Sequence, residues 1–159
     1  MKIKIGINGM GRIGRMILRS IFEGNKDIEI KHINNRTNSE TCSTLLKYDS
    51  IHGKFKADIS YDEKNLIVNK NKISFGQETD LNKIDWKKYG VDYVFECTGK
   101  FNFKDKLGPH LNNGAKKVIV SAPCKNADKT IVFGVNESEL NKEDEIISAA
   151  SCTTNCLAP

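Results

Sequence analysis

Long hydrophobic runs, paired cysteines and an export signal are all missing from this sequence. Its apolar stretches are a handful of residues long, far short of the roughly 20 needed to cross a bilayer, so we expect no membrane span. Glycines, an asparagine and an arginine interrupt residues 1–12, which leaves no apolar signal core and predicts a cytoplasmic protein. None of the five cysteines has the C-x-x-C spacing of a zinc site, so we expect reduced thiols and no metal.

Concentrated charge is also missing. The chain has 25 basic and 20 acidic residues, a net charge of +5, but no run of five or six like charges. Of the closest lysine pairs, only Lys87–Lys88 has aromatic neighbours, Trp86 and Tyr89, that could stack on bases. We therefore expect no dedicated nucleic-acid partner, and the mild positive charge suits small anionic metabolites equally well.

The 159 residues are enough for one domain in which strands and helices alternate. A strand over 2–8, a helix over 12–22 that stops at Gly24, and a strand over 28–34 have the length of a βαβ unit. Helices are also expected over 39–48, with Ser39 as its cap, and over 103–111. Further strands are expected over 57–61, 65–68, 72–75, 91–97, 117–121, 130–133 and 146–149. This pattern predicts an α/β fold: a doubly wound, mostly parallel, Rossmann-like sheet with a small antiparallel insertion.

A glycine-rich turn, GMGRIG at residues 9–14, joins the first strand to the first helix. In that setting Gly9 would make the tight turn, Gly11 would let a pyrophosphate approach the backbone, and Gly14 would let helix and strand pack closely. Backbone N–H groups at the start of the helix would then face the anion. The alternative is a strand-to-helix turn that binds no ligand.

The end of the second strand bears on which dinucleotide would bind. An acidic residue about 20 positions after the glycines normally accepts hydrogen bonds from the ribose 2′-hydroxyl of NAD, but this chain has Asn34, Asn35 and Arg36 there. An amide followed by a cation does not repel a 2′-phosphate. We therefore expect NADP, or both NADP and NAD, with Arg36 and either Thr37 or Asn38 as phosphate partners. The alternative is that Arg36 is only a solvated loop charge.

Cys152 follows the last predicted strand, so it should lie at a strand-to-helix junction. A helix N-terminus favours the nucleophilic thiolate form of cysteine. A cysteine in such a place can also be an ordinary packed side chain, and its neighbours are needed to choose between the two.

Six segments, together extending along the whole chain, resemble the glyceraldehyde-3-phosphate dehydrogenase family. They are 6–15 (GINGMGRIGR), 46–53 (LKYDSIHG), 96–101 (ECTGKF), 114–123 (GAKKVIVSAP), 134–136 (GVN) and 151–159 (SCTTNCLAP). The resemblance implies oxidative phosphorylation of glyceraldehyde 3-phosphate to 1,3-bisphosphoglycerate. Cys152 would form a thioester and a hydride would pass to NAD(P), while Ser151 and Thr153 would bind the inorganic phosphate that attacks.

The same resemblance implies further roles. The backbones of Arg12 and Ile13 would bind the pyrophosphate, and Thr98 and Ser121 would line the path of the dinucleotide. Residues 1–150 would be the NAD(P)-binding domain and 151–159 the start of a catalytic domain whose remainder, with the family's histidine base, is absent.

We therefore expect a fragment that binds coenzyme without turnover, from a parent that forms homotetramers. Two alternatives stay open: a parent that acts on erythrose 4-phosphate, and a non-catalytic nucleotide-binding module in which Cys152 is inert.

Overall fold

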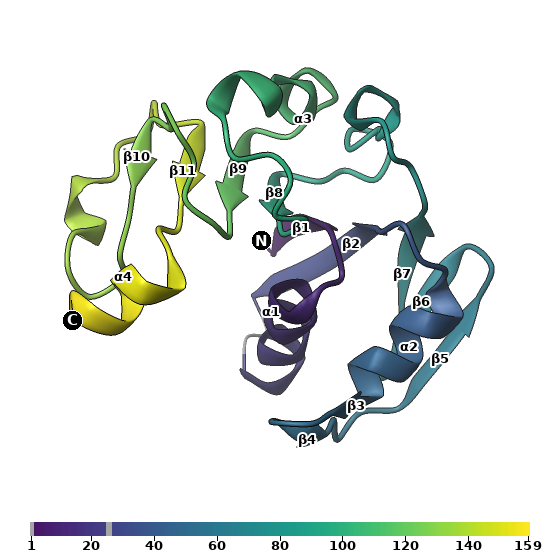
Figure 1. Cartoon of the computed structure of the whole chain (residues 1–159). Coiled ribbons are helices and arrows are strands. Elements are labelled where there is room, and N and C mark those ends of the chain that lie inside the picture. Colours follow the sequence, from purple (N-terminus) through teal and green to yellow (C-terminus); the bar gives the residue numbers. More distant parts are fainter. Residues whose placement is uncertain (1, 25–26) are drawn as a thin grey trace.

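The computed structural model describes residues 2–24 and 27–159, and a nine-stranded sheet forms its centre (Figure 1). The strand order is β10-β11-β9-β8-β1-β2-β7-β6-β5, and β3 and β4 form a separate pair. The strands are β1 (Ile3–Asn8), β2 (Ile28–Asn34), β3 (Tyr48–Asp49), β4 (Gly53–Lys54), β5 (Ile59–Asp62), β6 (Asn65–Val68), β7 (Asn71–Gly76), β8 (Tyr93–Glu96), β9 (Lys117–Val120), β10 (Lys129–Thr130) and β11 (Ile146–Ser148). The helices are α1 (Arg12–Gly24), α2 (Ser39–Lys47), α3 (Gly108–Asn112) and α4 (Cys152–Leu157), with single 3₁₀ turns at Leu81–Lys83, Lys104–Lys106 and Glu137–Glu139.

The sheet confirms the predicted doubly wound α/β fold. All pairings from β10 through β11, β9, β8, β1 and β2 to β7 are parallel, whereas β5, β6 and β7 pair antiparallel and form the predicted insertion. The chain leaves β1 toward β2 on one side and returns to β8 on the other, so the winding direction reverses between β1 and β8. In such sheets ligands bind at the carboxyl ends of the strands at this reversal.

Apolar side chains cover both faces of the central strands. On one face Ile5 and Ile7 of β1 pack with Leu18 of α1 in the largest core cluster. On the other face a Cβ atom added to Gly6 would meet the ring of Trp86, which is fully buried. This two-sided burial is what a parallel sheet with helices on its faces requires.

Two helix predictions need correction. Asn38, not Ser39, caps α2, because the Asn38 Oδ1 accepts the Thr41 N–H at 2.9 Å. Ser39 is instead a buried helical residue whose hydroxyl donates to the carbonyl of Asp62 at 2.7 Å. The helix expected over 103–111 is broken into the 3₁₀ turn and α3, because Pro109 lies in the first turn of α3 and a proline is tolerated there but not inside a helix.

The strand expected over 130–133 is also wrong in extent, since β10 stops at Thr130. The side chain of Asn136 takes the backbone groups that would continue it: its Oδ1 accepts the Val132 N–H at 2.8 Å, and its Nδ2 donates to the Thr130 carbonyl at 3.1 Å. An asparagine side chain that competes with the ladder in this way ends a strand.

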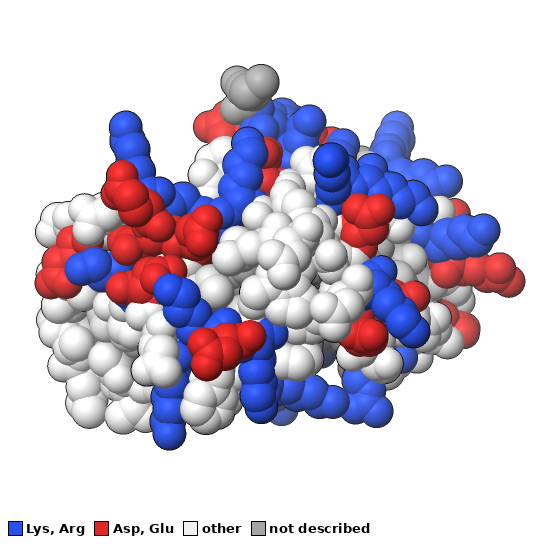
Figure 2. All heavy atoms as spheres, turned by 90° about the horizontal axis from the view of Figure 1, so that it is seen from above, with Lys and Arg blue, Asp and Glu red and all other residues white. Residues whose placement is uncertain are grey.

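Within the described residues, no helix is long and apolar enough to cross a bilayer, and no group of three metal-ligating side chains is placed to hold an ion. On the face seen in Figure 2, Lys and Arg side chains are spread out with Asp and Glu between them.

Candidate functional site

A cleft of about 470 Å³ opens at the carboxyl ends of β1, β2 and β8, where the winding direction of the sheet reverses. More than half of its lining residues are glycine, asparagine or threonine, and the others include two cations and one carboxylate. The lining residues are Asn8, Gly9, Gly11, Asn34, Asn35, Arg36, Glu78, Thr79, Leu81, Cys97, Thr98, Lys100 and Phe101. Its position is the one expected for a nucleotide in a doubly wound sheet.

The three glycines of the turn have the local geometry that their spacing predicts. Gly9 has φ +98°, and a Cβ atom added to it would lie 2.8 Å from the backbone nitrogen of Thr98. A Cβ atom added to Gly14 would overlap the carbonyl oxygen of Gly9. Gly11 faces open space, with nothing within 4 Å of an added Cβ atom. The turn is therefore closed against the protein at Gly9 and Gly14 and open toward a ligand at Gly11.

Helix α1 begins directly after this turn. The first residues of a helix have backbone N–H groups without acceptors inside the helix, and the helix dipole makes that end partly positive. Arg12 and Ile13, the first two residues of α1, are exposed, and its first turn has no acidic residue. These features fit the pyrophosphate of a dinucleotide.

Asn35 holds the glycine turn rather than facing the cleft with a free amide. Its Oδ1 accepts the Met10 N–H at 2.9 Å, and its Nδ2 donates to the Thr37 hydroxyl at 2.6 Å and the Cys42 sulfur at 3.2 Å. Sequence reasoning missed this arrangement, because two of the partners, Met10 and Cys42, come from other segments, the glycine turn and α2. The next residue, Arg36, is exposed and lines the cleft.

Thr98 and Ser121 differ in position, although both were expected beside the dinucleotide. Thr98 lines the cleft, and its backbone N–H and its hydroxyl both donate to Glu96 Oε1, the former at 2.8 Å. Ser121 follows β9, is half-buried and is not part of the lining. It hydrogen-bonds the thiol of Cys97, whose pKa burial nevertheless raises to about 12.

Cys152 is the first residue of α4 and is exposed. Ser151 caps this helix with a hydroxyl that accepts the Thr154 N–H at 3.0 Å, and Thr153 is exposed beside it. The residue before the cap, Ala150, has φ +59°, so the chain turns sharply between β11 and α4. The predicted strand-to-helix junction is therefore confirmed.

Cys42, Cys97 and Cys124 are all less exposed than Cys152. Burial raises the pKa of Cys42 and of Cys124, as it does for Cys97, so all three are held in the protonated form near neutral pH. Cys124 is 8% exposed, as expected for a small packed side chain. Since the thiolate is the nucleophile, these three cysteines are poor candidates for covalent chemistry.

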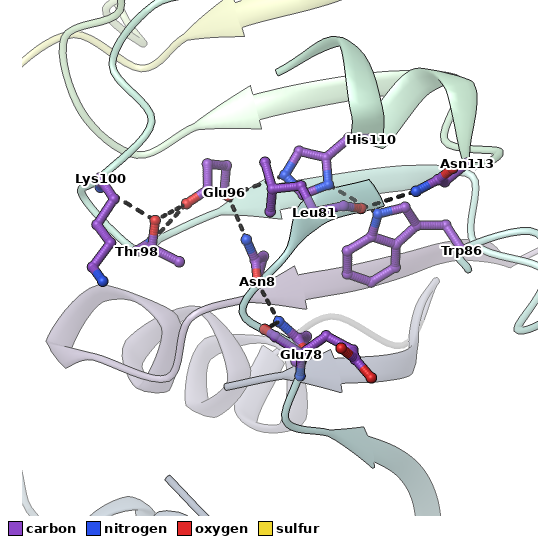
Figure 3. Close-up of polar contacts among 10 residues, drawn as sticks. Asn8, Glu78, Leu81, Trp86, Glu96, Thr98, Lys100, His110 and Asn113 are labelled. Carbon is purple, nitrogen blue, oxygen red and sulfur yellow. Dashed lines mark hydrogen bonds and ion pairs between the residues drawn. The ribbon is translucent and has the colours of Figure 1, made fainter. Parts of the chain in front are cut away.

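A buried polar network below the cleft was not predicted (Figure 3). It links Asn8 at the end of β1 to Glu96 at the end of β8, and Glu96 to His110 and Trp86. The one available signal was a polar residue at the end of each of two apolar strands. Nothing in the spacing indicated that these residues would meet.

The sequence matches known proteins along its whole length. The family described as "Glyceraldehyde 3-phosphate dehydrogenase, NAD binding domain" matches residues 3–104. A glyceraldehyde-3-phosphate dehydrogenase of Thermotoga maritima is 50% identical over 157 residues, covering 98% of this chain and 47% of that protein. That of Geobacillus stearothermophilus is 49% identical over 160 residues, covering 100% of this chain and 48% of that protein.

The chain thus spans about half the length of the curated relatives it matches. The family match covers the glycine turn, the Asn35–Arg36 segment and Thr98, and the aligned relatives extend through Cys152. The fold, the cleft at the reversal of the sheet and these matches agree. The chain belongs to the glyceraldehyde-3-phosphate dehydrogenase family and contains its NAD-binding domain.

Proposed function

We propose that this chain is the coenzyme-binding part of a phosphorylating glyceraldehyde-3-phosphate dehydrogenase, with residues 1–150 as the NAD(P)-binding domain and 151–159 as the start of the catalytic domain. The observation that carries the proposal is that the open glycine turn and the exposed Cys152 both follow carboxyl ends of parallel strands in one sheet. Family membership supports it.

The chain's own residues have separate tasks in this reaction. The turn at Gly9 and Gly11 and the first N–H groups of α1, at Arg12 and Ile13, would hold the pyrophosphate. The Cys152 thiolate would attack the aldehyde carbon of glyceraldehyde 3-phosphate. A bound nicotinamide coenzyme supplies a hydride acceptor.

Loss of the hydride from that carbon leaves a thioester on Cys152. Inorganic phosphate, held by Ser151 and Thr153, then attacks the thioester carbonyl, 1,3-bisphosphoglycerate leaves, and the thiolate is restored. Cys152 and Thr153 are exposed at the start of α4, which supports access for both substrates.

The same proposal includes NADP as the preferred coenzyme, or use of NADP and NAD alike. Asn35 carries no charge to repel a 2′-phosphate, and its amide is occupied by Met10, Thr37 and Cys42. The exposed Arg36 lies in the cleft lining beside it. The Thr37 hydroxyl accepts from Asn35 Nδ2 and also lies 3.4 Å from the Cys42 sulfur, so Arg36 is the main partner proposed for a 2′-phosphate.

Calorimetric titration of the chain with NADP and NAD tests the coenzyme part. We expect binding of both, NADP more tightly, and a loss of the NADP advantage in Arg36→Ala. Micromolar binding of NAD with no measurable binding of NADP would contradict the preference, and binding of neither would contradict the proposed function.

An activity assay tests the catalytic part. We propose that the chain alone does not turn over, because each histidine has a place elsewhere: His32 is buried against Tyr89, His110 is buried in the polar network, and His52 lies in the turn between β3 and β4. Efficient reduction of coenzyme by this chain with glyceraldehyde 3-phosphate and phosphate would refute that statement. Comparison with erythrose 4-phosphate, using the longer parent, separates the two substrates.

For the longer parent we propose a cytoplasmic homotetramer that acts on small molecules, without a membrane or dedicated nucleic-acid partner. On the face seen in Figure 2, basic side chains are interspersed with acidic ones, which supports the last point for that face. Light scattering of the purified parent would measure the oligomeric state, and a monomer would contradict the tetramer.

A further inference from the structure

Glu96 is a buried carboxylate beside the cleft in which we propose that a polyanion binds. Its side chain is 1% exposed, and it lies at the end of β8 in register with Asn8 at the end of β1. A negative charge in this place opposes the binding of phosphates by Coulomb's law. For coenzyme to bind here, Glu96 must also make a favourable contribution to the site that outweighs this repulsion.

One chain of hydrogen bonds reaches Glu96 from β2 and has a fixed direction. Asn34 is oriented by the backbone of Glu78, whose N–H donates to Asn34 Oδ1 at 2.8 Å and whose carbonyl accepts from Asn34 Nδ2 at 2.9 Å. The same Nδ2 donates to Asn8 Oδ1 at 2.8 Å. Asn8 can then only donate onward, and its Nδ2 donates to Glu96 Oε2 at 2.6 Å.

A second chain of hydrogen bonds reaches the same oxygen from α3 (Figure 3). The indole N–H of Trp86 can only donate, and it donates to His110 Nδ1 at 2.9 Å. The proton of a neutral His110 must then be on Nε2, which lies 3.1 Å from Glu96 Oε2. His110 is fully buried, so it has no access to water that could reverse this order.

The other carboxylate oxygen of Glu96 binds Thr98, a lining residue of the cleft. Glu96 Oε1 accepts both the backbone N–H and the hydroxyl of Thr98, and the Thr98 Oγ1 accepts the Lys100 N–H at 3.2 Å. A Cβ atom added to Gly9 would also lie nearest to the backbone of Thr98. A shift of Thr98 would therefore shift or collide with the glycine turn.

We infer that Glu96 is a positioning residue of the coenzyme cleft, an inference that rests on the proposed function. Its carboxylate is the common acceptor for donors from β1, from the β8 loop and, through His110, from α3, and it fixes Asn8 and Thr98 as one wall of the cleft. Asn8, Asn34 and Thr98 are all lining residues. The gain is a preformed site, which lowers the ordering cost of binding.

The substitution Glu96→Gln tests this with little change of shape. The glutamine amide has a donor NH₂ group where the carboxylate has a second acceptor oxygen. If the NH₂ group takes the place of Oε1, it faces the donors of Thr98. If it takes the place of Oε2, it faces the donors of Asn8 and His110. We expect the NADP or NAD dissociation constant to rise at least tenfold in calorimetry under conditions where circular dichroism shows the variant folded.

Asp128→Asn is the matched control. Asp128 is likewise an acceptor of backbone N–H groups, from Glu145 at 3.1 Å and Ile146 at 2.9 Å, and pairs with Lys104, but it directly precedes β10 and is not in the cleft lining. We expect it to lose stability and keep the wild-type dissociation constant. If Glu96→Gln behaves in the same way while the wild type binds coenzyme, the positioning role is overturned and the proposed function is not.

A double variant provides a readout that general destabilisation would not give. In Trp86→Phe the His110 Nδ1 is released, so the imidazole can move its proton to Nδ1 and accept, through Nε2, from the amide that Glu96→Gln introduces. This removes one of the two donor conflicts at that amide and leaves the one with Asn8. We expect Trp86→Phe combined with Glu96→Gln to bind coenzyme several-fold more tightly than Glu96→Gln alone. Nitrogen NMR of His110 should show Nε2–H in the wild type and Nδ1–H in the double variant; an unchanged tautomer together with no rescue contradicts the network.

Should Glu96→Gln fail to fold, Thr98→Val replaces it. That variant removes the hydroxyl donor to Glu96 together with the acceptor of the Lys100 N–H, and it should weaken coenzyme binding several-fold, whereas Thr98→Ser should restore the wild-type value. Equal binding by both variants overturns the inference. Failure of the wild type to bind either coenzyme overturns the proposed function instead.

Discussion

The cleft region around β1, α1, β2 and β8 differs sharply from the terminal region formed by β10, β11 and α4. The first is closed by long-range contacts: the Asn8–Glu96 hydrogen bond joins residues 88 positions apart, and both side chains are buried. The second has strands of two and three residues and exposes Phe133 at 84% and Leu157 at 78%. The chain therefore preforms its nucleotide cleft, while Cys152, the proposed nucleophile, begins a short exposed helix that has few neighbours to orient it.

The largest expected effect is in the cleft region, at Gly14. A Cβ atom there would overlap the backbone oxygen of Gly9, and neither group can rotate away. Gly14→Ala should therefore lower the free energy of unfolding by about 3 kcal/mol, the upper end of overpacking costs. Urea unfolding followed by circular dichroism measures it.

Gly11→Ala is the matched control, because its added methyl group meets open space. We expect Gly11→Ala to change the unfolding free energy little but to weaken coenzyme binding. Equal stability of both variants would contradict the close approach of α1 to β1.

The second effect is a loss of stability at acid pH that comes from His32. Burial, followed by the nearby Lys88, lowers the pKa of His32 to about 4 from 6.5. His32 is 3% exposed, and its ring stacks on that of Tyr89 with 3.9 Å between the ring centroids and lies edge-on to Trp86. Among the described residues, its Nδ1 has no hydrogen-bond partner.

Between pH 6.5 and 4 the unfolded chain holds a proton at His32 that the folded chain does not hold. The free energy of unfolding therefore rises with pH in this window. The contribution of His32 is fully present above about pH 6.5, and about 3 kcal/mol of it is lost as the pH drops to 4. His32→Phe keeps the stacked ring and should flatten the curve of unfolding free energy against pH. Parallel curves for wild type and variant would rule out His32 as the source.

Thiol reactivity tests the other side of the comparison. The exposed Cys152 should react with iodoacetamide at about pH 7.5 at least tenfold faster than Cys42, Cys97 and Cys124, whose pKa values are raised by burial. Peptide mass spectrometry at successive times gives each rate. Equal slow labelling of Cys152 and Cys124 would support a non-catalytic module.

The smallest expected effects come from the helix caps of the two regions. Asn38 caps α2, which packs Cys42 and Leu46 into the core, so Asn38→Ala should cost about 1 kcal/mol of unfolding free energy. Ser151 caps the exposed α4, so Ser151→Ala should cost less than about 0.5 kcal/mol, because local fraying there need not change global unfolding. Equal costs would mean that α4 is part of the cooperative core.

Local patterns were enough to predict the elements whose causes are local. The glycine turn, the βαβ unit and the junction before Cys152 follow from spacing and from the residues at strand ends. The break at Pro109 was also a local signal, and the prediction of a helix over 103–111 gave it too little weight. By contrast, Asn38 was passed over for Ser39, although both residues can cap a helix.

The remaining features depend on contacts between distant segments. The inward hydrogen bonds of Asn35 need Met10 and Cys42, and the acceptor role of Glu96 needs Asn8 and His110. No spacing rule connects these positions, since the fold alone brings them together. For the same reason Ser121 could be placed at the end of a strand but not excluded from the cleft lining.

Trp86 gives this molecule an optical property of its own. The sequence contains one tryptophan, so all indole emission comes from a ring whose N–H is tied to His110 and through it to the floor of the cleft. The wavelength and intensity of that emission depend on the strength of this bond. We therefore expect the emission of Trp86 to change when nucleotide binding shifts Glu96 and His110.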